Sequence, residues 1–590
     1  MDELNSFNRS DESYELEGQG DFDSNFHSLP DYGFSNFMEE DYQQSPDSDH
    51  GLLNNLRLDM ASPPIHTCLE EIAKLERITN EDLKRGKHKN PPSLASLELL
   101  KSHGTGFKKL TGERIIEATC PVQIRPDRVR LSVIEIMRIA GVKLVHSASK
   151  MNEDNPSDIP GHRYGHHCSD LTGIEVKNVH LAENLMNAVE KVSNEQFENA
   201  SSLLDEIDQL CSYTGEPVER IVYYFSEALR EKIDRETGQT SDKGLGKKLT
   251  IDLDKVIMGP TSQMLACHRR IPFSQILQFS GVQVIIDHVM DARRVHIIDL
   301  GIRNGCHWTV LMQALASRRH EPPLELVKIT AITTCLEKDI AETGKRLESF
   351  AKTLDLPFSY KILSGIIFYV LINGAMFLTK VIMLLDMLDL KEDVFDLGEE
   401  EKESVVVYAD FLLKTMISKP DRLEWLMKVL KSINPCVVVI NEVESNHNSP
   451  NFVNRFVESL FYYSAYFDSL DECMEDGDDG QNRRMTESDL FGQAIRRILA
   501  AEGEERNIRH VKIAVWRAFF TRFGMEEVDL GMASLYQAEL VVRRFPCRSS
   551  CTLDLDGKSL IIRWKGIPIH SLSAWKFQQP EEEKYDDSHL

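Results

Sequence analysis

The sequence predicts an α/β protein built on a mostly parallel β-sheet, and two observations carry this prediction. Short β-branched runs alternate with helical patterns over the second half of the 590-residue chain. Strands that alternate with helices form right-handed βαβ units, whose strands lie parallel. A largely apolar run at residues 295–298 also leads through an Asp-x-Gly turn into a helical pattern at residues 308–315, which is a strand-turn-helix unit. Such a turn lies at the carboxyl edge of the sheet, where nucleotide-type ligands bind, although its Asp and Gly residues can equally serve only to shape a tight turn.

Composition and charge limit the classes of function that the protein can have. The chain carries a formal charge of −26 with 42% hydrophobic residues, so it can bury a large core but does not dock on DNA or RNA by its own field. Its 11 Cys show no paired CxxC spacing, and the first residues lack the basic and apolar layout of a secretion signal, which indicates a reducing, cytosolic or nuclear compartment. Local basic spots such as Arg543 and Arg544 do not form a recognition helix, so we expect any DNA contact to be indirect or weak.

Residues 1–92 are expected to form a disordered acidic arm. The first 50 residues hold 14 Asp or Glu against the single basic residue Arg9, and aromatic residues are spaced among the acids. This composition cannot bury a core, and acidic residues that alternate with aromatic ones are typical of disordered activation segments. A tail that only keeps the protein in solution has the same composition, so both interpretations stay open.

A compact basic cluster lies near the end of this arm. It precedes a Pro-Pro pair and consists of Lys84, Arg85, Lys87 and Lys89. A cluster of this kind is a candidate nuclear import signal. Clusters this short also occur on ordinary protein surfaces, which is the alternative interpretation.

A second cluster has the residue types of a metal site without the spacing. It consists of His162, His166, His167 and Cys168. A structural zinc site needs four ligands in closed geometry, and no second ligand pair stands nearby at the usual spacing. We therefore expect no metal here.

Ordered structure is expected to begin in a transitional, partly helical segment at residues 93–174. A helical cap then follows over residues 175–290, where apolar residues recur at helical spacing. The first apolar face comprises Leu181, Leu185, Ala188, Val189 and Val192. The second comprises Phe197, Ala200, Leu203, Leu204 and Ile207. Such stripes are either intramolecular core or leucine-rich dimer seams.

The α/β core is expected over residues 291–580. After the first strand, further strands are predicted at residues 326–332, 404–408 and 436–440, with helical segments at 411–418 and 421–432. The last hundred residues predict helices at 495–502 and 511–522 and strands near 538–543 and 559–564. Four of the five Trp lie beyond residue 420, so this end is expected to be packed. An acidic tail, residues 581–590, closes the chain.

Several separated blocks, taken together, resemble one family of plant proteins, the GRAS family. The first strand and its turn are similar to the VHIID motif through Val295, His296, Ile297, Ile298 and Asp299, followed by Gly301, Gly305 and Trp308. A second block consists of Glu342, Thr343 and Gly344. The terminal blocks, similar to the SAW motif and the residues before it, are Arg563, Trp564, Ser573, Ala574 and Trp575. Leucine-rich regions at 175–290 and 405–435 stand in the order that the family shows.

The resemblance implies a Rossmann-like, methyltransferase-like core under a helical cap, together making a GRAS domain at residues 175–580. It also implies a transcriptional regulator in the nucleus that acts in plant development, hormone or symbiosis signalling. Its partners would be DNA-binding transcription factors and other GRAS proteins, as a homo- or heterodimer, without a membrane and without a cofactor. The chain is most similar to DELLA-like and SCARECROW-like members. The gibberellin-sensing DELLA motif is absent, because Asp2, Glu3 and Leu4 are followed by Asn5 and Ser6.

Residues 362–380 are an atypical insertion relative to this family. Relatives run almost directly from the segment at 358–361 to that at 381–390, whereas this chain interposes a Gly-, Phe- and Ile-rich stretch. A membrane span is not expected, because Asn373, Thr379 and Lys380 interrupt the apolar run and a span would break the sheet. A retained intron or gene-model error is the favoured hypothesis, and a genuine insertion is the alternative.

A rival interpretation is an S-adenosylmethionine-type methyltransferase or a small-ligand-binding protein, because strand-Asp-x-Gly also opens that cofactor loop. The usual loop has glycines at alternate positions so that the backbone can approach the ligand. Here Arg303 occupies the second such position and is expected to intrude on the pocket, while no acid for the ribose hydroxyls follows the second strand before Glu337. We therefore expect no catalytic residues and no cofactor.

Overall fold

The computed structural model describes residues 130–150, 171–238 and 262–578, apart from short gaps at 304, 319–322, 333–336, 364–366, 369–380, 383–394, 396, 398–402, 475–476 and 507. The acidic arm with its basic cluster, the His and Cys cluster at 162–168, the acidic tail and most of the insertion lie outside the described residues. Of the helices in the described part of the chain, none is both long and apolar enough to cross a membrane.

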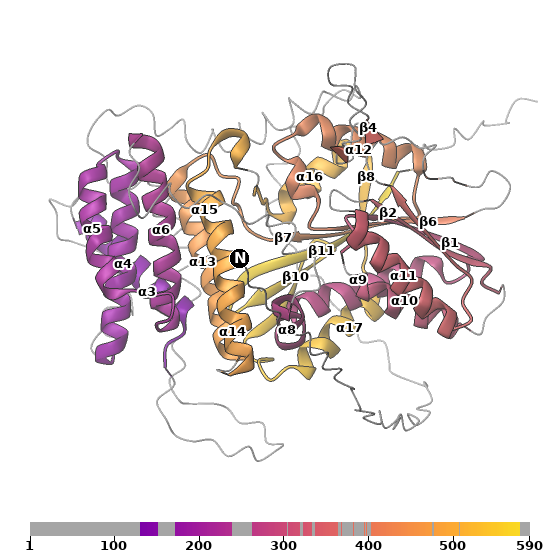
Figure 1. Cartoon of the computed structure of the whole chain (residues 1–590), viewed down its shortest axis with the longest axis horizontal. Helices are drawn as coiled ribbons and strands as arrows, with labels where there is room; N and C mark the ends of the chain where they lie inside the picture. The colour runs from indigo at the N-terminus through magenta and orange to yellow at the C-terminus, as the bar shows by residue number, and fades with distance from the viewer. Residues whose placement is uncertain are drawn as a thin grey trace, which may run out of the picture. The chain divides into compact units, whose positions relative to one another are not determined.

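A nine-stranded sheet forms the centre of the described structure (Figure 1). Its order is β3-β2-β1-β6-β7-β11-β10-β9, and β8 pairs with β11 beside β10. The strands are β1 (Arg294–Leu300), β2 (Leu326–Ile332), β3 (Phe358–Leu363), β6 (Ser404–Asp410), β7 (Val437–Val443), β8 (Met525–Val528), β9 (Cys551–Asp556), β10 (Ser559–Trp564) and β11 (Ile567–Phe577). Strands β3 through β7 in this order pair in parallel, whereas β11 is antiparallel to β7, β8 and β10. The prediction of a mostly parallel α/β core is confirmed.

Strand β1 is the central strand of the parallel part. Ile297 lies opposite Ile329 of β2 on one side and opposite Val406 of β6 on the other. Because successive side chains of a strand point to opposite faces, Ile297 and Ile298 enter two different apolar clusters. A parallel strand covered on both faces reads as a nearly continuous apolar run, which is what made this strand recognisable.

Helices cover both faces of the sheet. Helices α9 (Phe273–Val289), α10 (Cys306–Ala316), α11 (Glu337–Thr353) and α17 (Gly531–Arg544) contribute to the first cluster, which also contains Ile297. The opposite face is covered by η4 (Leu413–Met416), α12 (Pro420–Ile433) and α16 (Ile513–Arg522). This three-layer arrangement is the Rossmann-like architecture expected for the core.

The helical cap is built from α3 (Val133–Lys150), α4 (Gly173–Ser193), α5 (Phe197–Leu210) and α6 (Pro217–Thr237). Helix α4 begins with a capping box, in which Thr172 and Glu175 each accept a backbone N–H of the other. Helix α6 begins with Pro217 and ends before Gly238 in the left-handed conformation, two local signals that fix its ends. The predicted apolar faces of α4 and α5 are buried within the chain and contribute to its core.

The packing crosses the boundary expected near residue 290. Helices α13 (Phe452–Cys473) and α15 (Gln493–Leu499) come late in the sequence, yet α13 packs against α3, α4 and α6, and α15 packs against α6 (Figure 1). In the opposite direction, α9 belongs to the earlier region but packs on β7, β11 and α17. The remaining helical elements are α8 (Ser262–Arg270), α14 (Asp478–Met485), the π-helical turn η5 (Thr486–Gly492) and η6 (Gly503–Glu505).

Two sequence predictions are wrong. Residues 538–543 form part of helix α17 rather than a strand. Their β-branched run suggested a strand, but Ala538, Val541 and Val542 recur at helical spacing and are buried in the cluster that includes α9. The helix predicted at 411–418 is only the short 3-10 turn η4, because Phe411 has a left-handed backbone (φ 57°) that a helix does not accommodate.

The ends of the insertion lie side by side. Strand β3 ends at Leu363, and two short strands, β4 (Ile367–Phe368) and β5 (Val381–Ile382), then pair antiparallel with Ile367 opposite Ile382. The chain therefore leaves and returns at one place, while residues 369–380 lie outside the described residues.

Candidate functional site

The turn after β1 is closed by a hydrogen bond between two buried side chains. The indole Nε1 of Trp308, in the first turn of α10, donates to Oδ2 of Asp299 at 2.8 Å. Both residues are almost completely buried, and burial raises the pKa of Asp299 to about 7 even though the bond from Trp308 opposes that rise. The backbone N–H of Gly301 donates to the carbonyl of Ile332, so the turn is also held to β2.

The second predicted block packs directly against this turn. Gly305 has φ +66°, and a Cβ there would lie 2.9 Å from Cγ2 of Thr343. The hydroxyl of Thr343 donates to the carbonyl of Arg303 at 3.2 Å. Gly344 faces the ring of Tyr360, which would lie 2.4 Å from an added Cβ. Glu342 is exposed on α11, so the three adjacent residues have different surroundings.

The remaining residues of the first strand are core residues. Val295, Ile297 and Ile298 are buried in the two apolar clusters. His296 is also buried, and its Nε2 lies 2.8 Å from Oγ1 of Thr330 on the neighbouring strand. These side chains position the sheet and present no surface to a partner.

The terminal motif residues lie elsewhere in the sheet. Trp564 of β10 donates from Nε1 to Oδ2 of Asp468 at 2.8 Å, which joins the sheet to α13. Trp575 donates from Nε1 to the hydroxyl of Ser573 at 2.9 Å within the same strand.

Two further residues of the terminal blocks differ in their exposure. Ala574 is buried and pairs with Val439 of β7, whereas Arg563 donates to Asp554 at 2.6 Å on a more exposed face. The predicted motif residues are thus spread along the sheet, and only those of the turn and of the Glu342 block come together.

A cavity of about 280 Å³ lies beside the turn, at the carboxyl ends of β1, β6 and β7. Arg303 and His307 contribute from the turn after β1, while Asp410 and Phe411 contribute from the end of β6. Helices α8, α9 and α13 and the turn η5 supply the other walls. This is the edge of a parallel sheet at which ligands of α/β proteins bind.

Arg303 lies on the wall of this cavity, where the sequence placed it. Its guanidinium lies 3.6 Å from Oδ2 of Asp410 and donates to the backbone carbonyl of the same residue at 3.3 Å. The guanidinium carbon lies 5.3 Å from the ring centre of Phe411, within cation–π range. The acid expected for a ribose would belong to residues 333–336, which lie outside the described residues.

Buried histidines form a feature that sequence reasoning missed. His510 and His570 line the cavity together with His307. His447 lies behind them, with its Nδ1 2.7 Å from Nδ1 of His510. Burial lowers the pKa of all four, to about 4 for His307, about 3 for His447 and His570, and well below the ordinary value for His510. All four are therefore neutral at physiological pH.

The pair Asn441 and Glu442, at the end of β7, has structural roles. The side-chain amide of Asn441 donates to the hydroxyl of Tyr408 at 2.8 Å and to Oδ1 of Asp410 at 3.0 Å. Glu442 accepts the backbone N–H of Lys414 at 3.3 Å, and burial raises its pKa to about 7. Among the described residues, no group of three or more His, Cys, Asp or Glu side chains is arranged to hold a metal ion.

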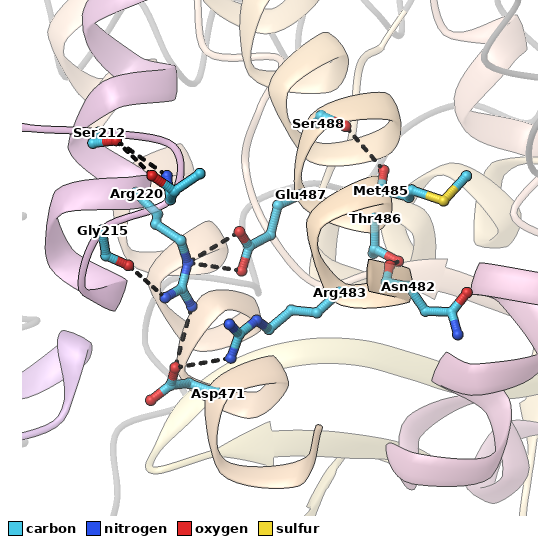
Figure 2. A network of polar contacts seen from close by, with 11 residues as sticks. Ser212, Gly215, Arg220, Asp471, Asn482, Arg483, Met485, Thr486, Glu487 and Ser488 are labelled. Carbon is cyan, nitrogen blue, oxygen red and sulfur yellow. Dashed lines mark hydrogen bonds and ion pairs between the residues drawn. The ribbon is translucent and has the colours of Figure 1, made fainter. Parts of the chain in front are cut away.

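A buried ion network joins the cap to the turn η5, which forms one wall of the cavity (Figure 2). Nε of Arg220, on α6, donates to both carboxylate oxygens of Glu487 at 3.0 and 3.1 Å. Its other two nitrogens donate to the carbonyl of Gly215 at 3.0 Å and to Asp471 at 3.2 Å. Arg483 approaches the same Asp471 oxygen at 3.5 Å. Figure 2 shows Arg220 reaching across from the cap between the two carboxylates.

The sheet order and the cap define an α/β protein with a Rossmann-like core under a helical layer. The GRAS domain family model matches residues 181–576, and the chain belongs to this family. It is similar to the DELLA protein GAI1 of Vitis vinifera, with 30% identity over 409 residues covering 69% of this chain and 63% of that protein. The DELLA protein RGL1 of Arabidopsis thaliana is 29% identical over 405 residues, covering 68% of this chain and 71% of that protein.

A solved structure shows the same fold. The crystal structure of SCL7 in Oryza sativa matches with a TM-score of 0.55 at 24% sequence identity, covering 67% of this chain and 99% of that one. The chain spans less than two thirds of the length of GAI1, which is 63% covered. The expected family and fold class are confirmed.

Proposed function

We propose that this protein is a transcriptional regulator of the nucleus that acts through protein-protein contacts in plant development, hormone or symbiosis signalling, and that it is not an enzyme. The observation that carries the proposal is the closure of the turn after β1. The carboxylate of Asp299 accepts a hydrogen bond from the indole of Trp308. Arg303 occupies the second position at which the usual loop has a glycine, and its guanidinium pairs with Asp410. A nucleotide-binding loop keeps these positions open for its ligand. A turn filled by the protein's own side chains serves as a scaffold.

Partner binding is the direct test of the proposal. We expect tagged full-length protein, purified from nuclei of its native tissue, to carry DNA-binding transcription factors and other GRAS proteins with it. The isolated protein should not shift a promoter fragment, because its net charge is −26, whereas the fragment should shift when a recovered factor is added. Tight DNA binding by the isolated protein would contradict the proposal.

We infer that the cap offers the surface for a second GRAS chain. Helices α4 and α5 are joined by a short connection and pack together, so the start of α4 and the end of α5 both lie on the side of this pair that is remote from the connection. Apolar side chains are exposed at both of these ends, with Ile174 60% and Tyr213 54% exposed. Exposed apolar groups that gather in one place mark interaction surfaces.

The dimer test uses two matched substitutions. Ile174→Glu should abolish capture of an untagged copy, or of another GRAS protein, by a tagged copy. Met532→Glu, at a residue of α17 that is 81% exposed, should leave capture unchanged. Equal capture by both variants would place the interface elsewhere.

Nuclear import is proposed to depend on the basic cluster of the arm. A fluorescent fusion in which Lys84, Arg85, Lys87 and Lys89 are all changed to Ala should shift toward the cytoplasm. A control fusion with Arg543→Ala and Arg544→Ala has lost basic residues outside the arm and should stay nuclear. Nuclear retention of the first fusion would exclude the cluster as the import signal.

The alternative function is binding or turnover of S-adenosylmethionine, favoured only by the strand-Asp-x-Gly pattern. Calorimetry of the purified protein with this cofactor tests it directly. We expect no heat of binding, because Arg303 repels the positively charged sulfonium group and fills the loop. Saturable binding in the micromolar range would revive the enzyme hypothesis.

A further inference from the structure

We propose that the cavity beside the turn is a binding site for a small organic acid with a flat apolar body and a single anionic group. The proposal goes beyond the regulatory function and does not depend on it. It assigns this acid to the space between the carboxyl edge of the sheet and the helices above it.

The size and walls of the cavity fit an apolar body. A cavity of about 150 Å³ lined by apolar side chains holds a benzene ring, and this cavity has about 280 Å³. It therefore has room for a body of about two rings. Aromatic side chains from three different segments, among them Phe273, Tyr463 and Phe491, line it, and rings favour flat ligands that pack face or edge against them.

One end of the cavity is cationic. Among the described residues that line it, Arg303 and Lys414 are cations and Asp410 is the carboxylate. Both cations lie over the ring of Phe411, at 5.3 Å and 5.7 Å from its centre. Glu442 lies behind Lys414, but burial raises its pKa to about 7, so it offsets only part of this positive charge. An anionic ligand group is favoured at this end.

The backbone at this cationic end is strained. Phe411 has a left-handed backbone with φ 57°, and its N–H donates to the carbonyl of Asn441 at 2.9 Å. A bulky residue in this conformation costs free energy and is found where the surroundings fix it, often at ligand sites. Here the fixed backbone holds an aromatic ring against the cavity and within cation–π range of both cations.

Three of the lining histidines carry a buried ring nitrogen without a hydrogen-bond partner among the described residues. In the described part of the chain, these atoms are Nε2 of His510, Nε2 of His307 and Nδ1 of His570. The contact between His447 and His510 occupies Nδ1 of His510, so its Nε2 is left either as a donor or as an acceptor. A hydroxyl group on the ligand can satisfy either form, whereas an ionised carboxylate can only accept from the N–H form, and a buried polar group without a partner is costly.

The test uses a pair of probes that share one skeleton and differ in the anionic group. The probes are naphthalene-2-sulfonate, which carries a sulfonate, and naphthalene-2-sulfonamide, which is neutral, and both have the two-ring body that the cavity has room for. We expect the purified full-length protein to bind the sulfonate probe saturably at one site, and the neutral probe at least about tenfold more weakly, because a charge-assisted contact is lost. Many weak sites, no saturable binding or equal affinity for the two probes would overturn the proposal.

Matched variants locate the binding site. Arg303→Gln should weaken binding of the sulfonate probe about tenfold and leave the neutral probe unchanged, whereas Arg543→Gln, on the exposed part of α17, should change neither. Near-ultraviolet circular dichroism checks that each variant is folded, and Lys414→Gln replaces Arg303→Gln if that variant unfolds. Unchanged affinity for the sulfonate probe in a folded Arg303→Gln or Lys414→Gln variant would overturn the assignment.

Discussion

The indole Nε1 of Trp308 and the carboxylate of Asp299 form a 2.8 Å hydrogen bond across the turn that follows the central strand. Two residues nine positions apart thus fix how α10 leaves the sheet. In the same turn, the guanidinium of Arg303 lies 3.6 Å from the carboxylate of Asp410, so this cation is paired within the protein.

Two substitutions of Asp299 should distinguish how much its hydrogen bond and how much its charge contribute to the free energy of unfolding. Asp299→Ala leaves the buried indole N–H of Trp308 without an acceptor and should reduce the free energy of unfolding by about 1–3 kcal/mol. Asp299→Asn keeps an acceptor oxygen and should cost less. Urea denaturation of the three proteins measures the difference. If Asp299→Ala stayed fully stable and kept every partner, this turn would not organise the domain.

The stabilities of the wild-type protein and of the Asp299→Asn variant should depend differently on pH. The pKa of Asp299 is about 7 in the folded protein and about 3.9 in an unfolded chain. Between these values the folded form binds more protons, so wild-type stability falls as pH rises through this window, relative to the Asn variant. From about pH 5 to about pH 7 the Asn variant should gain about 2 kcal/mol on the wild type. Parallel stability curves would contradict the raised pKa.

Gly305 should be less replaceable than another glycine with the same backbone angle. Gly305 and Gly238 have φ +66° and +67°, but only at Gly305 would a Cβ meet an atom, Cγ2 of Thr343 at 2.9 Å. Gly238→Ala should cost about 1 kcal/mol from backbone strain, and Gly305→Ala should cost about 2–4 kcal/mol. Adding Thr343→Ser to Gly305→Ala removes the clashing methyl and should restore part of the loss. Equal costs at the two glycines would show that strain alone acts.

The pair of Arg220 and Glu487 should behave as a buried ion pair. Arg220→Ala leaves the Glu487 carboxylate buried without its principal partner and should cost about 3–5 kcal/mol at neutral pH. Replacing both residues by Met should cost less than the single change, because no charge is then left unpaired. The exposed pair Arg543 and Glu539 is the control, and Arg543→Ala should cost no more than about 0.5 kcal/mol. A double variant as unstable as the sum of its single changes would contradict this account.

The insertion should be dispensable for the fold. Because Ile367 pairs with Ile382, a two-residue turn can replace residues 369–380 without moving β3 or β6. Such a variant should melt within about 2 °C of the wild type, since loop length changes stability only weakly. Sequencing the transcript across codons 355 to 390 tests the related hypothesis of a retained intron. A large loss of stability would indicate an insertion that belongs to the core.

Local patterns predicted strands β1, β2, β6, β7 and β10 but missed β3, β8, β9 and β11, and they predicted the site poorly. Strand β2 was predicted at its observed bounds because its apolar run is buried on both faces. The run at 538–543 misled because β-branched residues also occur in helices, and only contact with α9 distinguishes the two. The four buried histidines at and behind the cavity come from positions 307, 447, 510 and 570, and no spacing within the sequence brings them together. Arg303 was placed correctly because it lies in the turn after β1, at the edge of the sheet that borders the cavity, whereas its partners Asp410 and Phe411 come from the end of β6 and could not be predicted.

Helix α13 is translated long after the cap helices that it packs against. Helices α3 to α6 end at Thr237, whereas α13 starts at Phe452, so the ribosome makes more than 200 residues between them. At about 5–20 residues per second, the apolar surfaces that α13 covers stay open for roughly 10 to 40 seconds. We therefore expect the cap to need chaperones during translation, and we expect a truncated chain that ends before residue 452 to aggregate rather than to act as a free-standing helical module.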